Sequence, residues 1–214
     1  MELKSKKVVF LGDSITEGKC IANPDDIYHA VFARMTESTA VAYGIGGTRI
    51  AKQKVPSTDN PRHDLDFIGR VDAMDADADV VVVFGGTNDF GHGTAPMGSI
   101  DSRDPYTFYG AMHTLCMLLI EKYPDAQLCF MTPLHREGDT VPKKGKPWIL
   151  EDYITAIKDV TRYYAIPTLD LHAVSGIQPN YPTIHARYTA DGLHPNEAGH
   201  VKIAEKLAGF LKSL

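Results

Sequence analysis

The sequence has little cysteine, and the cysteine it has forms no recognisable motif. Only three cysteines, Cys20, Cys116 and Cys129, occur in 214 residues, and no CxxC pair is present. An odd number of widely spaced thiols argues against a disulfide framework and favours a reducing compartment. Cys116 and Cys129 lie in apolar segments, where small buried thiols are common. We therefore expect a cytoplasmic protein.

Long apolar runs and an excess of positive charge are also missing. The apolar run after the basic N-terminus is interrupted within a few residues, which is too short for a signal peptide or a membrane span. The net charge of −5 predicts neither nucleic acid nor an anionic membrane as a partner. A local basic run, Lys143, Lys144 and Lys146, is expected in a solvated loop. The length and the 43% hydrophobic content suit one domain spanning residues 1–214.

Metal-binding motifs are absent as well. The nine histidines are scattered, and neither HxxxH nor HExxH occurs. The sequence therefore predicts no metal site. Most of the histidines are expected at the surface or in the core. Two of them, His92 and His135, follow predicted strands and could contact a substrate.

What the sequence does contain is an alternation of short apolar runs and helix-like segments. Runs rich in β-branched residues predict strands at 7–11, 39–43, 79–84, 127–131 and 168–171. Apolar residues at helical spacing predict helices at 24–37, 64–74, 106–123, 148–164 and about 196–214. Because the strands are apolar throughout, we expect a parallel sheet that is covered by helices on both faces.

Some details of the helices and loops also follow from the pattern. Asn23 is a candidate cap for the helix at 24–37, and Pro195 suits the first position of the last helix. The apolar face of the last helix is expected to hold Ala198, Val201, Ala204, Leu207, Ala208 and Leu211. Three stretches without a clear pattern follow predicted strands, and we expect them to build a pocket: 90–104, 134–147 and 175–191.

Polar residues follow the predicted strands at the points where they end. The strands are followed by Asp13-Ser14, by a glycine-rich turn and by Asn88-Asp89, and an Asp/His pair precedes the last helix. Carboxyl ends of parallel strands meet at one edge, so these groups should converge. Acyl transfer through serine needs a hydroxyl, an imidazole, a carboxylate and oxyanion donors, and each has a candidate here. The simpler alternatives are that Ser14 is a turn or cap residue, and that Asn88 or Asp89 caps a helix.

Four segments carry a resemblance to a known family. GDSIT, GIGGT, GGTND and DGLHP, in this order from Gly12 to Pro195, resemble the sequence blocks of the SGNH hydrolases, also called GDSL-type esterases and lipases. The resemblance implies a flavodoxin-like α/β fold, a three-layer α/β/α sandwich around a parallel sheet. It also implies catalysis through an acyl-enzyme, with neither metal nor cofactor.

The resemblance assigns roles residue by residue. It implies Ser14 as the nucleophile, His194 as the general base and then acid, and Asp191 as the carboxylate that orients the imidazole. The oxyanion donors would be the backbone N–H groups of Ser14 and Gly47 and the side-chain amide of Asn88.

Two further positions bear on these assigned roles. Asp13 is expected in a supporting role, with hydrogen bonds to backbone amides of the turn. Ala42 departs from the family pattern, which often has asparagine five residues before the oxyanion glycine.

The substrate is inferred from the loops. They are polar and lack a long apolar stretch, so we expect a serine esterase for a short acyl group, acetyl, on a polar carrier such as a sugar. A thioesterase or lysophospholipase for longer chains would use the same residues. From another class, a non-enzymatic flavodoxin-like module could bind phosphate or a nucleotide at helix N-termini. The sequence is compatible with a monomer or a homo-oligomer.

Overall fold

A five-stranded parallel sheet organises the protein. The computed structural model describes residues 1–143 and 145–214, and within them the strands lie in the order β2-β1-β3-β4-β5. The strands are β1 (Lys7–Gly12), β2 (Thr39–Gly44), β3 (Val80–Phe84), β4 (Gln127–Met131) and β5 (Thr168–Leu169). This order is that of flavodoxin-like doubly wound folds, so the predicted fold class is confirmed.

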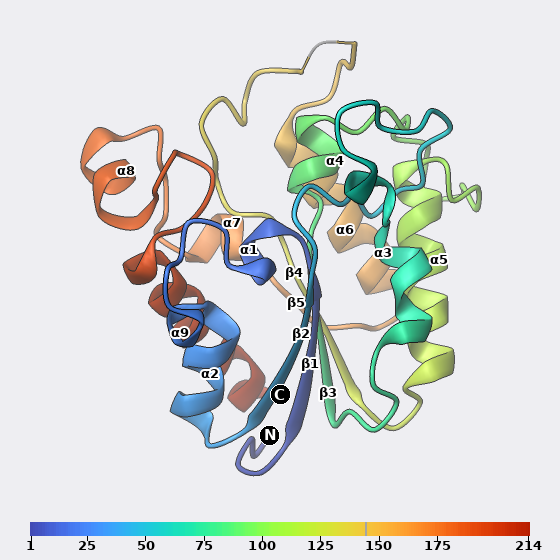
Figure 1. The fold of residues 1–214 in the computed structure, drawn as a ribbon. Helices are drawn as coiled ribbons and strands as arrows, with labels where there is room; N and C mark the ends of the chain where they lie inside the picture. Colours follow the sequence, from blue (N-terminus) through green and yellow to red (C-terminus); the bar gives the residue numbers. More distant parts are fainter. Residues whose placement is uncertain (144) are drawn as a thin grey trace.

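Helices cover both faces of the sheet (Figure 1). One face carries α2 (Tyr28–Thr36) and α9 (Glu197–Ser213), and the other carries α3 (Phe67–Arg70), α5 (Phe108–Lys122) and α6 (Leu150–Tyr163). Side chains alternate along each strand, and so the four longer strands, β1 to β4, contribute to two cores. In β1, Val9 and Leu11 belong to the core under α5 and α6, whereas Val8 and Phe10 belong to the core under α2 and α9. This double burial explains why the strands are apolar throughout.

Two predicted helices are broken up in the structure. The segment predicted as one helix at 24–37 forms a 3-10 turn, Pro24–Asp26, and then α2, with an extended residue, Ile27, between them. Asn23 caps the 3-10 turn, through a bond from the backbone N–H of Asp25. The segment at 64–74 contains only short pieces, and the carboxylate of Asp66 caps α3.

The chain after β4 also departs from the prediction. The strand expected at 168–171 ends at Leu169, because Asp170 caps a new helix, α7 (Leu171–Val174). The stretch 175–191, expected to be irregular, contains α8 (Pro182–Tyr188). The list of predicted helices thus lacks several short helices at the carboxyl edge: α1 (Ser14–Glu17), α4 (Thr87–Gly91), α7 and α8. A turn or two of helix is too short to show a periodic pattern.

The buried face of α9 is rotated relative to the prediction. Ala198 and Val201 are exposed, and the buried residues are Gly199, His200, Ile203, Ala204, Leu207, Ala208 and Leu211. Pro195 does not begin the helix. It precedes Asn196, whose side chain caps α9 by accepting from the Gly199 backbone N–H at 3.1 Å. No described helix combines the length and the apolar character that crossing a membrane requires.

The basic run is not simply solvated, so that prediction is wrong for Lys146. Its ammonium group donates to the backbone oxygens of Asp89 and Phe90, at 2.6 Å each. These oxygens lie in the last turn of α4, where carbonyls lack helical partners. Lys143 lies over the Phe90 ring, 5.0 Å from its centroid, and Lys144 lies outside the described residues.

A buried histidine joins the two helices on one face. The side chain of His200 stacks on Tyr28, with ring centroids 6.0 Å apart, and its Nδ1 accepts from the Tyr28 backbone N–H at 3.0 Å. This contact satisfies the first N–H group of α2 and explains why that helix begins at Tyr28. Burial lowers the pKa of His200 from 6.5 to about 4.

This histidine should make the fold sensitive to acid. The unfolded chain binds a proton at His200 below pH 6.5, whereas the folded chain does so only near pH 4. Stability from this group is therefore present above pH 6.5 and lost as the pH falls toward 4, by an amount on the order of 3 kcal/mol. In His200→Asn, whose amide oxygen can accept the Tyr28 bond, chemical denaturation should show a shallower loss across this pH range. Parallel curves for the two proteins would contradict the prediction.

Candidate active site

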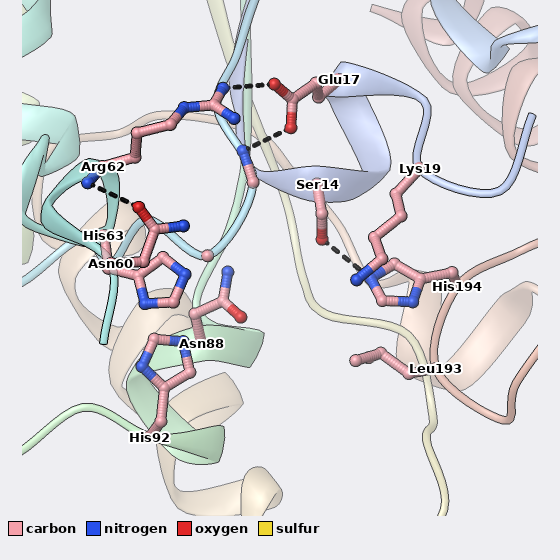
Figure 2. Close-up of a pocket in the computed structure, with 12 residues that line it drawn as sticks. Ser14, Glu17, Lys19, Asn60, Arg62, His63, Asn88, His92, Leu193 and His194 are labelled. Carbon is pink, nitrogen blue, oxygen red and sulfur yellow. Dashed lines mark hydrogen bonds and ion pairs between the residues drawn. The ribbon is translucent and has the colours of Figure 1, made fainter.

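Ser14 and His194 lie in contact although 180 residues separate them in the chain. Ser14 is the first residue of α1 (Ser14–Glu17), directly after β1, and its Oγ lies 3.0 Å from His194 Nε2 (Figure 2). Both side chains are almost fully buried. His194 is held by a tight turn, in which Gly192 has a φ of +75° and Thr189 pairs with Pro195. The turn leads directly into α9, so the residue that carries the imidazole is anchored close to the start of a long helix.

Asp191 binds the other side of the His194 imidazole. Its Oδ2 lies 2.7 Å from Nδ1, and its Oδ1 accepts from the backbone N–H groups of His194 and Leu193, at 2.7 and 3.0 Å. Partial burial alone would raise the pKa of Asp191. The hydrogen bonds from His194 and Leu193 outweigh it, and the pKa lies below its usual value. An ionised Asp191 makes Nδ1 the protonated nitrogen, and Nε2 then faces Ser14 with a free lone pair.

A buried carboxylate precedes the serine. Asp13 caps α1, and its Oδ1 accepts from the backbone N–H of Ile15 at 3.0 Å. Burial raises the pKa of Asp13 to about 7, although the Ile15 bond and the nearby Arg70 act in the opposite direction. Asp13 is therefore a structural part of the turn that presents Ser14, rather than a group facing the cavity.

The glycine-rich turn after β2 is held by charged side chains that the sequence analysis did not identify. The backbone N–H of Gly46 donates to Glu17 Oε2 at 2.8 Å. Gly47 has a φ of +77°, and a Cβ added to it would collide with the His63 ring. Arg70 is buried and donates to Thr48 Oγ1 at 3.0 Å, and also to the backbone oxygens at the ends of β1 and β2.

The position that departs from the family pattern, Ala42, is exposed on the edge strand β2. The side chains that bind the turn are those of Glu17 and Arg70. Nothing local marks Arg70 for this task, because its partners come from three separate segments.

Asn88 and Asp89 fasten α4 to the segment that follows the glycine turn. Asn88 Nδ2 donates to the Thr48 backbone oxygen at 3.0 Å. The carboxylate of Asp89 accepts from the backbone N–H groups of Ile50 and Ala51, at 2.9 Å each, and burial raises its pKa to about 6. Neither residue caps α4, whose N-cap position is Gly86, so the cap alternative is wrong for both.

A polar cavity of about 380 Å³ opens beside Ser14. The described residues that line it are Ser14, Glu17, Lys19, Gly46, Gly47, Asn60, Arg62, His63, Asn88, His92, Leu193 and His194 (Figure 2). The rings of His63 and His92 lie 5.0 Å apart, on the opposite side of the cavity from Ser14 and His194 (Figure 2). Burial lowers the pKa of His92 to about 4, with a contribution from Arg49, so its imidazole is neutral at physiological pH.

The loops around this cavity differ from those predicted. Of the three expected stretches, only 90–104 contributes, through His92, and neither 134–147 nor 175–191 adds a described residue to the lining. The segment 60–63, which had no strand before it to suggest a role, lines the cavity instead. His135, which was expected to be able to contact a substrate, is not among the residues that line the cavity.

The comparisons with known proteins agree with this geometry. Residues 10–202 match the model of the GDSL-like Lipase/Acylhydrolase family. A search among curated proteins found no significant match. A solved structure from Lactobacillus plantarum is 32% identical, covers 99% of this chain and 98% of its own, and superposes with a TM-score of 0.85.

Two further solved structures share the fold. One is 32% identical with a TM-score of 0.88, covering 100% of this chain and 99% of its own. The other is an acetyl xylan esterase, AlAXEase, which is 21% identical with a TM-score of 0.66 and covers 95% of this chain and 98% of its own. The family match spans most of the chain and includes all four sequence blocks. The protein belongs to the GDSL-like lipase/acylhydrolase family and is a hydrolase in which Ser14 is paired with His194.

Proposed function

We propose that this single-domain hydrolase is a serine esterase that removes a short acyl group, acetyl, from a polar carrier such as a carbohydrate. The observation that carries the proposal is the continuous set of contacts from Ser14 Oγ to His194 at 3.0 Å and from His194 to Asp191 at 2.7 Å. A phosphate-binding module would have no use for this arrangement. Three free thiols support a cytoplasmic location as part of the same proposal.

The contacts suit a two-step acyl transfer. His194 Nε2 takes the proton of Ser14 as Oγ attacks the ester carbonyl, and the imidazolium then protonates the departing alcohol. Water, deprotonated by His194, attacks the acyl-serine ester, and the proton returns to Ser14 as the acid leaves. The ionised Asp191 orients the ring and stabilises the imidazolium in both steps.

The oxyanion donors are proposed from groups around the same cavity. They are the backbone N–H groups of Ser14 and Gly47 and the side chain of Asn88. The Asn88 amide carries two N–H bonds, and only one is needed for the Thr48 oxygen, so the second can bind the oxyanion. One such donor is typically worth about 3 kcal/mol of transition-state stabilisation.

The cavity lining supports a short acyl group. Leu193 is the only large apolar side chain among the described lining residues, and the rest are polar, charged or glycine. A long acyl chain gains its binding energy from apolar contact, at about 0.8 kcal/mol per buried CH₂, and this lining has little to offer it. AlAXEase carries the name of an acetyl esterase, but at 21% identity that likeness concerns the fold.

Removal of the Ser14 hydroxyl tests the mechanism. In Ser14→Ala, turnover of p-nitrophenyl acetate should fall by about 10³-fold or more, since no other group can form the acyl-enzyme. A fluorophosphonate probe should label wild type at Ser14 and leave the variant unlabelled. Ser213→Ala, at an exposed position near the C-terminus, is the control and should keep full activity. Labelling of Ser14→Ala at wild-type level would place the nucleophile elsewhere.

A series of acyl lengths tests the substrate class. On p-nitrophenyl esters, kcat/KM should be highest for acetyl and fall by about tenfold or more for octanoyl, because Leu193 alone cannot bind the longer chain. Acetylated xylo-oligosaccharides should release acetate in the same assay conditions. A preference for octanoyl would instead favour the thioesterase or lysophospholipase alternative.

Gly47→Ala tests the oxyanion turn. Its positive φ should cost about 1–2 kcal/mol of stability, and the collision with His63 should displace the backbone N–H and lower kcat by about 10²-fold. Gly209→Ala is the matched control, because, apart from its chain neighbours and the backbone of its own helix, no described atom lies within 4 Å of its added Cβ. In a helix, this substitution should raise stability by up to about 1 kcal/mol and leave kcat unchanged. An unchanged kcat in a destabilised Gly47→Ala would exclude Gly47 as a donor.

A further inference from the structure

A second group of polar side chains lies away from the cavity. His135 and Asp139 belong to the segment between β4 and α6, and His172 belongs to α7, after β5. One ligand atom from each lies within 4.8 Å of the other two. The strands β4 and β5 are neighbours, so the two segments leave the same edge of the sheet side by side (Figure 1). We call these three residues the histidine–aspartate cluster.

The cluster is polar, packed and incompletely bonded. His135 Nδ1 lies 2.6 Å from Asp139 Oδ2, and the side chain of Asp139 is only 2% exposed. The His135 and His172 rings are in close contact, with centroids 3.4 Å apart and ring planes tilted by 36°. His172 Nδ1 is buried and has no hydrogen-bond partner among the residues that the structure describes. A buried polar atom without a partner costs free energy, and this cost calls for a ligand.

We propose that the histidine–aspartate cluster binds one divalent transition-metal ion of the Zn²⁺ class. Two imidazoles and a carboxylate are ligands that Zn²⁺ prefers, whereas Ca²⁺ and Mg²⁺ favour oxygen ligands. The ion replaces the hydrogen bond between His135 and Asp139: the His135 imidazole is neutral with its proton on Nε2, so Nδ1 is free to bind the ion, and water completes the coordination. The ligands lie in separate segments, which explains why the sequence analysis, relying on short motifs, predicted no metal site.

The surroundings of the cluster resemble those of metal ligands. Glu151 Oε2 lies 3.6 Å from His172 Nε2, so a carboxylate faces the ring nitrogen opposite the unpartnered Nδ1. Asn180 Nδ2 donates to Asp139 Oδ1 at 3.3 Å. Outer partners of this kind orient ligating histidines and carboxylates in metal sites.

The ion would act on the structure rather than on the ester. Arg136 and Glu137 lie between two of its ligands. Arg136 donates to Thr87 at the start of α4, and the backbone N–H of Glu137 donates to the Gly192 oxygen at 2.8 Å. A bound ion therefore fastens a segment that contacts the elements carrying both Asn88 and His194. This inference does not depend on the proposed esterase activity.

Metal binding is measured on the full chain after treatment with a chelator. Titration with Zn²⁺ by calorimetry should give about one equivalent bound, and the melting temperature should rise with added Zn²⁺. In His172→Ala and in Asp139→Asn, the affinity should fall by at least about tenfold. His172→Asn and His135→Ala serve as second variants, with folding checked by circular dichroism. His185→Ala is the matched control, because His185 contacts Glu137 but lies outside the cluster.

A rival set must be separated in the same experiment. Cys20, Asp191 and His194 also offer ligand atoms within 4.8 Å of one another. Co²⁺ bound to the histidine–aspartate cluster should lack a thiolate charge-transfer band, and Cys20→Ser should bind Zn²⁺ as tightly as wild type. Zn²⁺ bound at the cluster should also leave Ser14 open to the fluorophosphonate probe. No binding to wild type, or binding lost in Cys20→Ser and kept in folded His172→Ala, would overturn the proposal.

Discussion

The contact between Ser14 and His194 is the constraint on which the rest of the structure depends. It joins a residue at the end of the first strand to a residue at the start of the last helix, 180 positions later. The Ser14 hydroxyl can give its proton to His194 only if the imidazole nitrogen that faces it carries a lone pair. Asp191 keeps this lone pair free. Its hydrogen bonds keep its own pKa low, and the ionised carboxylate holds the imidazole proton on Nδ1, the nitrogen that faces away from Ser14. The doubly wound sheet brings the two residues together at one edge.

Buried carboxyl groups fix the backbone conformation around this contact. Asp13 and Asp89 are both almost fully buried, and burial raises the pKa of each well above its ordinary value. Each carboxylate accepts from backbone N–H groups of a turn beside the cavity, and Arg70 donates to the turn between them. Polar groups held in this way cost stability, but they hold a glycine-rich turn in one conformation. The histidine–aspartate cluster has the same character at the neighbouring strands, where His135 bonds to the buried carboxylate of Asp139 and packs against His172.

The sequence predicted most reliably those elements whose burial is complete. The strand β4 was predicted at its observed bounds, because apolar residues face helices on both sides. The helix at 24–37 was predicted as continuous and is not, because α2 begins where His200 accepts the Tyr28 bond, and that partner comes from the last helix. The predicted buried face of α9 differs from the observed face for a related reason. Gly199 and His200 pack inward, although neither has the apolar side chain that a periodic pattern detects.

By itself, the sequence determined the strand–helix alternation, the family and the order of the four blocks, since these depend on residues that are near one another in the chain. Only the tertiary structure decided which segments surround the cavity. It placed 60–63 there and left out 134–147 and 175–191. It also decided that Arg70 and Glu17 bind the glycine turn, and that His135, Asp139 and His172 meet. Contacts between distant segments depend on the packing of the whole sheet, and no local pattern records them.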